Sequence, residues 1–143
     1  MVQRNKVLFS IFLSFFFSCS AFKAYFNTFY NAKKIFNETE EAYKKNNYKL
    51  NPGIKQGYQK AIQKFLYVIK YYPKSPFIDD ALYYIILSYI RLEEYDKAIK
   101  KFEEIVKYAP YSKFTLYGFD KLSENLIEKE KFEEFKYVYV LIK

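Results

Sequence analysis

Hydrophobic positions in the second half of the chain recur with the spacing of an α-helix. Lys and Glu fill the positions between them. The clearest stripe has members at i, i+1, i+4, i+7 and i+8, namely Ala98, Ile99, Phe102, Ile105 and Val106. Because these offsets lie on one side of a helix, they predict an amphipathic helix that begins near Tyr95. A richly apolar segment, 76–91, predicts a second helix just before it.

The chain also repeats itself with a period of 37 residues. Residues 58–75 fall on residues 95–112 with ten of 18 positions identical. The predicted unit is a helix, a short link, a second helix and a Pro-Ser turn. Its small alanines are expected where two helices approach closely, and its aromatic rings are expected to fill the gap beside them. The residues that define the repeat are Ala61, Phe65, Pro73, Tyr95, Ala98, Phe102 and Pro110.

Helix boundaries follow from local signals. Pro110 is expected to end the helix that begins near Tyr95, and Ser75-Pro76 is expected to cap and start the helix at 76–91. A weaker third copy follows, in which Phe135 stands at the alanine position and should either splay the last two helices or mark an atypical end unit. The chain stops within that copy's second helix, so we expect either that a partner or a second copy covers this apolar end or that the chain is truncated.

The first unit departs from the period. Residues 24–47 predict one long helix, and 48–57 predict a loop because they contain an Asn-Pro-Gly turn signal. The next helix is expected at 57–72. The fold class is therefore predicted to be all-α, a solenoid of about three helix pairs after an N-terminal signal or anchor helix.

The N-terminus has the pattern of an export signal. Two basic residues in 1–6 precede an uncharged apolar run, 7–18, and then Cys19 and two small residues. This run has 12 residues, whereas a spanning helix needs about 20. Ser18-Cys19 resembles the end of a bacterial lipobox, which implies a signal peptide at 1–18, lipid on Cys19 and a mature domain at 19–143. An uncleaved anchor and cleavage near Ala21, which would leave a soluble protein, remain alternatives.

Composition narrows the chemistry. The chain has no His and one Cys, so it cannot build a His-based catalytic triad or a Cys/His zinc site by itself. Its net charge is +8, but the basic residues alternate with acidic ones along the predicted helices instead of forming a stripe. We therefore predict no enzyme activity, no cofactor, no metal and no nucleic-acid partner. An enzyme of unknown class is the least favoured hypothesis.

The repeat residues resemble the tetratricopeptide repeat (TPR). The match lies at Leu82, Ile85, Ile86 and Tyr89 on the first helix and at Tyr95, Ala98, Phe102 and Pro110 on the second. With Cys19 and the segment 25–34, the chain is similar to bacterial TPR lipoproteins such as BamD, of the outer-membrane β-barrel assembly machine. The resemblance implies a lipid-anchored periplasmic scaffold at the outer membrane. Its partners would be barrel-assembly components or unfolded segments of outer-membrane proteins. The alternative is an adaptor for cell-wall, secretion or gliding machinery.

In TPR proteins the first helices of successive pairs line a groove that holds a peptide or a partner helix. By position, the groove of the second repeat would be lined by Tyr83, Leu87, Ile90 and Arg91, with Arg91 pairing a partner's carboxylate. The alternative is that Leu87 and Ile90 simply pack against a neighbouring repeat. The third repeat would offer Asp120, Glu124, Ile127 and Glu128.

Overall fold

The computed structural model describes residues 26–143, and this part of the chain is helical with no strand. The prediction of an all-α, TPR-like solenoid is confirmed. A helix at 26–45 is followed by α2 (Pro52–Tyr71), α3 (Ile78–Arg91), α4 (Tyr95–Tyr108), α5 (Lys113–Glu128) and α6 (Phe132–Leu141). Cys19 and the predicted signal peptide, 1–18, lie outside the described residues. Within 26–143, none of the helices combines the length and the apolar character needed to cross a membrane.

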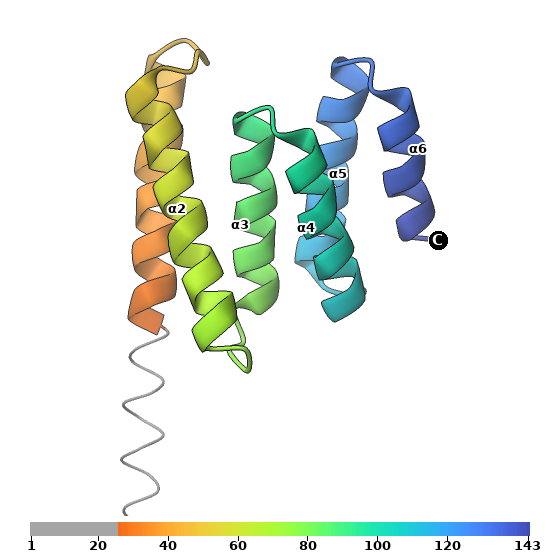
Figure 1. Ribbon diagram of the computed structural model, residues 1–143, viewed down its shortest axis with the longest axis horizontal. Coiled ribbons are helices and arrows are strands. Elements are labelled where there is room, and N and C mark those ends of the chain that lie inside the picture. The colour runs from red at the N-terminus through yellow and green to blue at the C-terminus, as the bar shows by residue number, and fades with distance from the viewer. Residues whose placement is uncertain (1–25) are drawn as a thin grey trace, which may run out of the picture.

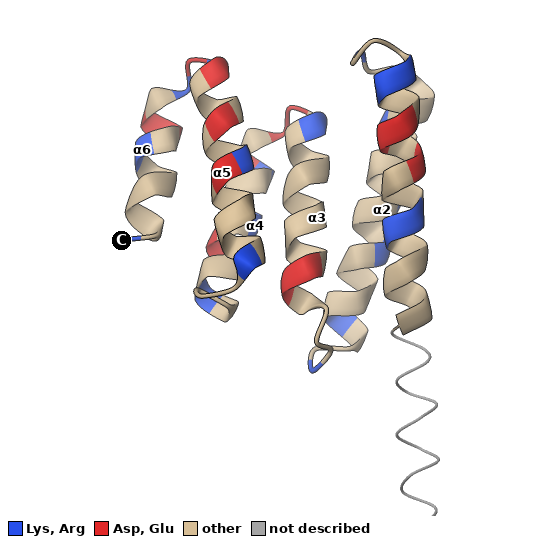
Figure 2. Cartoon of the chain, turned by 180° about the vertical axis from the view of Figure 1, so that it is seen from behind, with Lys and Arg blue, Asp and Glu red and all other residues tan. Residues whose placement is uncertain are grey.

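The helices form three antiparallel hairpins that stack side by side (Figure 1). The second helices, α2, α4 and α6, lie on the face shown in Figure 1. The first helices, 26–45, α3 and α5, lie on the face shown in Figure 2. We call the latter the first-helix face. Because α3 packs against α2, α4 and α5, it is the central helix of the described fold.

The links inside the hairpins repeat the sequence period in their backbone hydrogen bonds. The amide of Glu94 donates to the carbonyl of Tyr89 at 2.9 Å, and one period later the amide of Lys131 donates to the carbonyl of Leu126 at 2.8 Å. The residue before each of these donors, Glu93 or Glu130, has a positive φ, of 59° or 57°. This hydrogen bond, from an amide to the carbonyl five residues earlier with a left-handed residue inside the loop, is the Schellman ending of a helix. The 37-residue period is therefore present in the backbone as well as in the side chains.

The core lies between helices and is built from the repeat-defining residues. Ala61 and Ala98 expose no surface, and neither do the rings of Phe65 and Phe102. Tyr95 is also buried, whereas Pro73 and Pro110 lie exposed in the turns after α2 and α4. Small residues also recur on the first helices, where Ala81 and Gly118 are one period apart and both buried. A Cβ at Gly118 would make ordinary contacts with Ile86 and Phe102, so a small residue fits this position between α5 and the second repeat.

Two predicted boundaries were wrong. The segment 48–57 is not a loop throughout, because α2 already begins at Pro52. The Asn51 side chain accepts a hydrogen bond from the amide of Ile54 at 2.9 Å, so Asn-Pro here is an N-cap and a first helical residue instead of a turn. Gly57 gives α2 its close approach to the first helix, since a side chain at this position would collide with that of Thr39.

The second wrong boundary is at Ser75-Pro76. The helix begins at Ile78, and the Ser75 hydroxyl accepts a hydrogen bond from the amide of Phe77 before the helix starts. In the next copy, Ser112 does cap α5, through the amide of Phe114. The Ser112 hydroxyl also donates to the Asp79 carboxylate, which ties the start of α5 to the start of α3.

Candidate protein-binding face

An aromatic cluster joins α3 and α5 on the first-helix face. The ring centroid of Tyr83 lies 5.5 Å from that of Phe114 and 6.3 Å from that of Tyr117, and the last two rings are 6.2 Å apart. Tyr117 is half exposed and Tyr83 is partly buried. We call these three residues the aromatic cluster. Exposed rings held by packed neighbours bind partners at low entropic cost, because few of their rotamers remain to be lost.

Charged side chains lie near the aromatic cluster. The Lys113 ammonium lies 5.0 Å from the centroid of the Phe114 ring, and the Lys33 ammonium, from the first helix, lies 5.6 Å from that of Tyr84, the neighbour of Tyr83. Asp80 lies in the first turn of α3, the helix that carries Tyr83. Burial, together with the adjacent Asp79, raises the pKa of the Asp80 carboxyl to about 6, although Lys33 and Lys113 oppose this shift. Figure 2 shows that acidic residues lie at the start of α3 and a basic residue lies at its end.

The raised pKa of Asp80 predicts a pH dependence of stability. Between its ordinary value of 3.8 and about 6, the folded chain holds a proton on Asp80 that the unfolded chain releases. The free energy of unfolding therefore falls as pH rises through this window.

Asp80→Asn removes that contribution. The melting temperature of the variant minus that of the wild type should therefore be larger at pH 7 than at pH 4. Thermal melts at the two pH values measure this. Asp120→Asn, at an exposed site, is the control. If the difference in melting temperature between Asp80→Asn and the wild type were the same at both pH values, the prediction would be refuted.

At the other end of the same face, an ionic contact joins the first two repeats. The Arg91 guanidinium donates to Glu40 through Nε at 2.9 Å and through Nη2 at 3.3 Å. The Tyr58 hydroxyl also donates to Glu40 at 2.7 Å, and the Arg91 guanidinium carbon lies 5.5 Å from the centroid of the Tyr43 ring. Glu40 is well shielded, with its side chain 15% exposed, whereas Arg91 is 34% exposed. Burial and the bond to Glu40 raise the pKa of Tyr58, so its hydroxyl stays a donor.

A small hollow of about 230 Å³ opens beside Arg91. It lies among the last turns of the first helix, α3 and α5, and its lining is largely polar. The lining includes Tyr43, Ile90, Arg91, Asn125 and Glu128. This hollow and the aromatic cluster are two sites on one face, separated along α3 by Leu87.

The four residues predicted to line the groove of the second repeat have different surroundings. Tyr83 is in the aromatic cluster, and Leu87 is partly buried against the core of the first two repeats. Ile90 is only 3% exposed and packs in the core, so it contributes little surface to a partner. Arg91 lines the hollow, but the carboxylate that it holds belongs to Glu40 of the same chain.

Sequence reasoning missed Glu40, Phe114 and Tyr117. Glu40 is 51 residues from Arg91, and no local spacing links the two. Phe114 and Tyr117 could have been found from their spacing, since i and i+3 on α5 point toward the same side as Tyr83 on α3. Asp120, Glu124, Ile127 and Glu128 are all exposed on α5.

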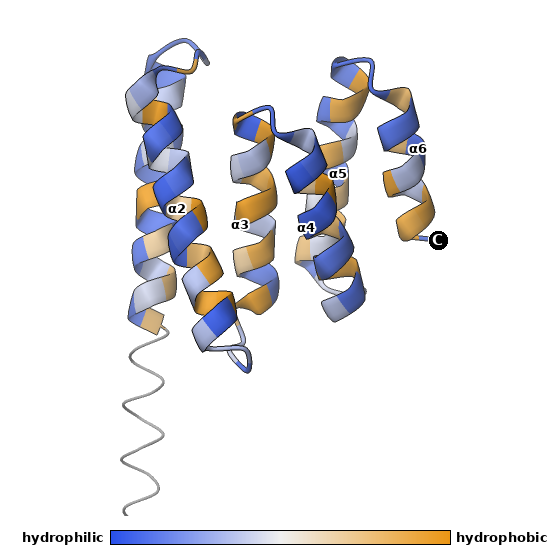
Figure 3. Ribbon diagram, viewed as in Figure 1, coloured by the Kyte–Doolittle hydropathy of each residue, from blue (hydrophilic) through white to orange (hydrophobic). Residues whose placement is uncertain are grey.

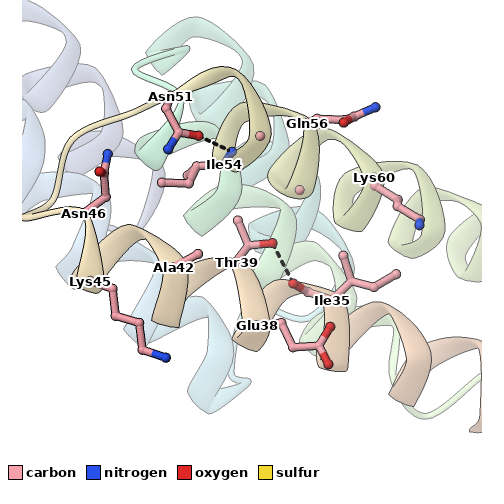
Figure 4. A pocket seen from close by; sticks show the side chains of 12 residues that line it. Ile35, Glu38, Thr39, Ala42, Lys45, Asn46, Asn51, Ile54, Gln56 and Lys60 are labelled. Carbon is pink, nitrogen blue, oxygen red and sulfur yellow. Dashed lines mark hydrogen bonds between the residues drawn. The ribbon is translucent and has the colours of Figure 1, made fainter.

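A larger hollow has a different character. It lies between the first helix and α2, holds about 760 Å³ and is widely open to solvent (Figure 4). The Thr39 hydroxyl donates to the carbonyl of Ile35, and Asn51 caps α2, so its central polar groups bond within their own elements. Glu38, Lys45 and Lys60 line its rim. Across residues 26–143 there is no cluster of three or more His, Cys, Asp or Glu side chains able to hold a metal ion.

Comparison with known families agrees with this geometry. The family model of the tetratricopeptide repeat matches residues 80–112, which cover most of α3, all of α4 and the turn after it. No curated protein matches the chain, and no solved structure matches it. TPR repeats generally bind partner proteins, and their all-helical fold is typically a non-enzymatic scaffold. Residues 80–112 are thus similar to a tetratricopeptide repeat, and the described residues around them have a TPR-like fold of stacked hairpins, which suggests a protein-interaction scaffold.

Proposed function

We propose that this protein is a lipid-anchored TPR scaffold of the bacterial envelope that binds proteins during the assembly of outer-membrane β-barrels. The first-helix face is the binding surface. Cys19 carries the lipid after removal of residues 1–18 and holds the scaffold at the outer membrane, facing the periplasm.

The observation that carries the proposal is the partly exposed aromatic cluster with charges of both signs beside it. Tyr117 is half exposed, Tyr83 and Phe114 are partly buried beside it, and Lys113 and Asp80 lie close by. An extended segment rich in aromatic residues would stack on these rings, while its polar backbone and side chains would meet the charged rim. Unfolded barrel proteins offer segments of this kind, because their strands place aromatic residues at the membrane interfaces.

The Arg91–Glu40 pair sets the geometry of that surface. It connects the first helix to α3 and so fixes the angle between the first and second repeats. A partner's carboxylate could replace Glu40 only by leaving a shielded acidic side chain without its cation, which is costly. We therefore assign Arg91 to positioning of the first-helix face and the aromatic cluster to partner contact.

The lipid anchor has its own test. Mass spectrometry of the mature protein from its native membrane should find residue 19 as the N-terminus with acyl chains attached. Several acyl chains, each methylene worth about 0.8 kcal/mol, would hold the protein firmly. A chain that retains Met1, or one that begins after Ala21 without lipid, would contradict the anchor without affecting the binding face.

Partner binding is tested with a matched pair of exposed tyrosines. Tyr117→Ser alters the aromatic cluster, whereas Tyr108→Ser alters α4, on the opposite face, at a similar exposure. Affinity purification of the full chain from cells should recover barrel-assembly components or barrel proteins with the wild type and with Tyr108→Ser, and at least about tenfold less with Tyr117→Ser. Recovery of cell-wall, secretion or gliding proteins instead would favour the alternative adaptor function, and equal recovery with both variants would contradict the assigned face.

A further inference from the structure

The two turns that join one hairpin to the next lie at the same end of the solenoid, the lower end in Figure 1. One turn follows α2 and the other follows α4. In each, a lysine and a tyrosine complete the preceding helix, and a further lysine or tyrosine stands three residues later. We call these residues the lysine–tyrosine pole, and they are Lys70, Tyr71, Lys74, Lys107, Tyr108 and Tyr111.

All six side chains of the lysine–tyrosine pole are exposed. Tyr111 is 99% exposed, and Tyr71 and Tyr108 are each 54% exposed, so burial in the core does not explain these rings. Tyrosine and lysine both join an apolar body to a polar tip, and the two turns are therefore not strongly hydrophobic (Figure 3). Side chains of this kind suit the boundary between water and lipid headgroups, where tyrosine is enriched.

The lysine–tyrosine pole carries positive charge that the described chain does not neutralise. The segments 70–78 and 107–114 each contain two lysines and no Asp or Glu. None of these lysines pairs with a carboxylate of residues 26–143. Figure 2 shows basic residues in both turns. The carboxylates that follow the first turn, Asp79 and Asp80, are partly buried, and Asp79 accepts a hydrogen bond from the Ser112 hydroxyl.

At the opposite end of the solenoid, charges of both signs are mixed. Three lysines there lie 2.6–3.0 Å from nearby glutamates, in the pairs Lys44–Glu41, Lys97–Glu94 and Lys129–Glu93. An anionic surface would therefore attract the lysine–tyrosine pole more strongly than the opposite end. The attraction requires close approach, because it is screened over a Debye length of about 8 Å at physiological salt.

The first helix begins at the same end as the lysine–tyrosine pole, at residue 26 (Figure 1). Residue 26 is seven positions after Cys19, and seven residues span at most about 25 Å even when fully extended. The opposite end of the solenoid lies further away by the length of the first helix, about 30 Å at 1.5 Å per residue. A lipid on Cys19 would therefore hold the lysine–tyrosine pole, and not the opposite end, near a membrane.

We propose that the lysine–tyrosine pole rests on the surface of an anionic phospholipid membrane. Its lysines contact the lipid phosphates, and its tyrosine rings lie among the headgroups. The helices then stand upright on the membrane, and the first-helix face is open sideways to partners. This inference deepens the proposed function and rests on it in one respect, the lipid on Cys19, which places the pole within reach of the surface.

The test uses single tryptophans, since the natural chain has none. Tyr111→Trp places the reporter in the lysine–tyrosine pole. Tyr48→Trp places it at the opposite end, where Tyr48 is 65% exposed. The protein purified from its native membrane is reconstituted in vesicles that contain phosphatidylglycerol with brominated acyl chains, which quench a nearby tryptophan. Quenching at position 111 should be at least about twice that at position 48.

A matched pair of charge variants tests the role of the lysines. Lys74→Gln with Lys107→Gln removes two exposed charges from the pole, whereas Lys45→Gln with Lys49→Gln removes two exposed charges from the opposite end. The first double variant should reduce the quenching at position 111 at least about twofold, and so should vesicles in which brominated phosphatidylcholine replaces the anionic lipid. The second double variant should leave it unchanged, and circular dichroism verifies that both fold.

Three results would overturn the proposal. These are equal quenching at positions 111 and 48, quenching at 111 that neither the pole variant nor zwitterionic lipid reduces, and a discrete protein cross-linked in cells by a photo-reactive amino acid at position 111, which would make the occupant an acidic protein.

The mass of the reconstituted chain separates this inference from the proposed anchor. A chain without lipid that is still quenched at position 111 would contradict the anchor and support the pole. A lipidated chain that is not quenched there would contradict the pole alone, and a chain with neither lipid nor quenching would contradict both.

Discussion

Replacing Phe102 by Ala is expected to lower the free energy of unfolding by about 3–5 kcal/mol. The ring has no exposed surface and lies in the core that α3, α4, α5 and α6 share. Its removal leaves a cavity that rigid helices cannot close, because their backbone crossings are set by small residues such as Ala98 and Gly118. For a domain whose whole stability is about 5–15 kcal/mol, such a loss is a large share.

Urea unfolding followed by circular dichroism measures this loss, with Tyr108→Ala as the control. Tyr108 is on the same helix and is half exposed, so its removal should change the free energy of unfolding by no more than about 0.5 kcal/mol. Similar losses for the two variants would show that Phe102 does not pack between the second and third repeats.

Breaking the contact between Arg91 and Glu40 is expected to have the next largest effect. Glu40→Ala and Arg91→Ala should each lower the free energy of unfolding by about 1–3 kcal/mol, because the first leaves the partly exposed Arg91 without its carboxylate and the second leaves the shielded Glu40 with only the Tyr58 hydroxyl as a donor. The double variant should lose less than the sum, with a coupling of at least about 0.5 kcal/mol. The partial exposure of Arg91 favours the lower part of these ranges.

The control is an ion pair within the helix that carries Glu40. Lys34 and Glu38 lie 3.8 Å apart with both side chains largely exposed, so a cycle on this pair should give a coupling of at most about 0.5 kcal/mol. If the two cycles gave the same coupling, the Arg91–Glu40 pair would be an ordinary surface contact and would not fix the angle between the repeats.

The sequence predicted those parts of the fold that depend on local spacing. The stripe of Ala98, Phe102 and Ile105 predicts both the helix and its buried side, because the period of 3.6 residues and the need to bury apolar surface act on the same few positions. The 37-residue period predicts the stacking, because a hairpin that buries one side on its neighbour must present the same kind of surface to the next.

Errors arose where one residue type serves two purposes. Asn51 and Pro52 occur in turns and also at helix starts, and only the hydrogen bond from the Ile54 amide decides between them. The Ser75-Pro76 boundary was misplaced for the same reason, since the serine can bond an amide in a turn or in a helix.

The candidate site was less predictable than the fold. Tyr83 and Arg91 were placed on the correct helix, but their neighbours come from other repeats. Glu40 meets Arg91 only because the first two hairpins stack, and Tyr117 meets Tyr83 only because α5 lies beside α3. Contacts of this kind depend on the angle between hairpins, for which a single sequence carries no local signal. The apolar end of α6, in contrast, was visible in the sequence, because its residues keep the spacing of core positions.

The central claim is that the first-helix face is where this scaffold holds its partners. It is tested most directly by photo-cross-linking in intact cells from two matched positions, 117 on α5 and 108 on α4, which are exposed to similar extents on opposite faces. We expect position 117 to yield discrete cross-linked proteins that position 108 does not. Cross-links from position 108 alone, or the same products from both positions, would contradict the claim.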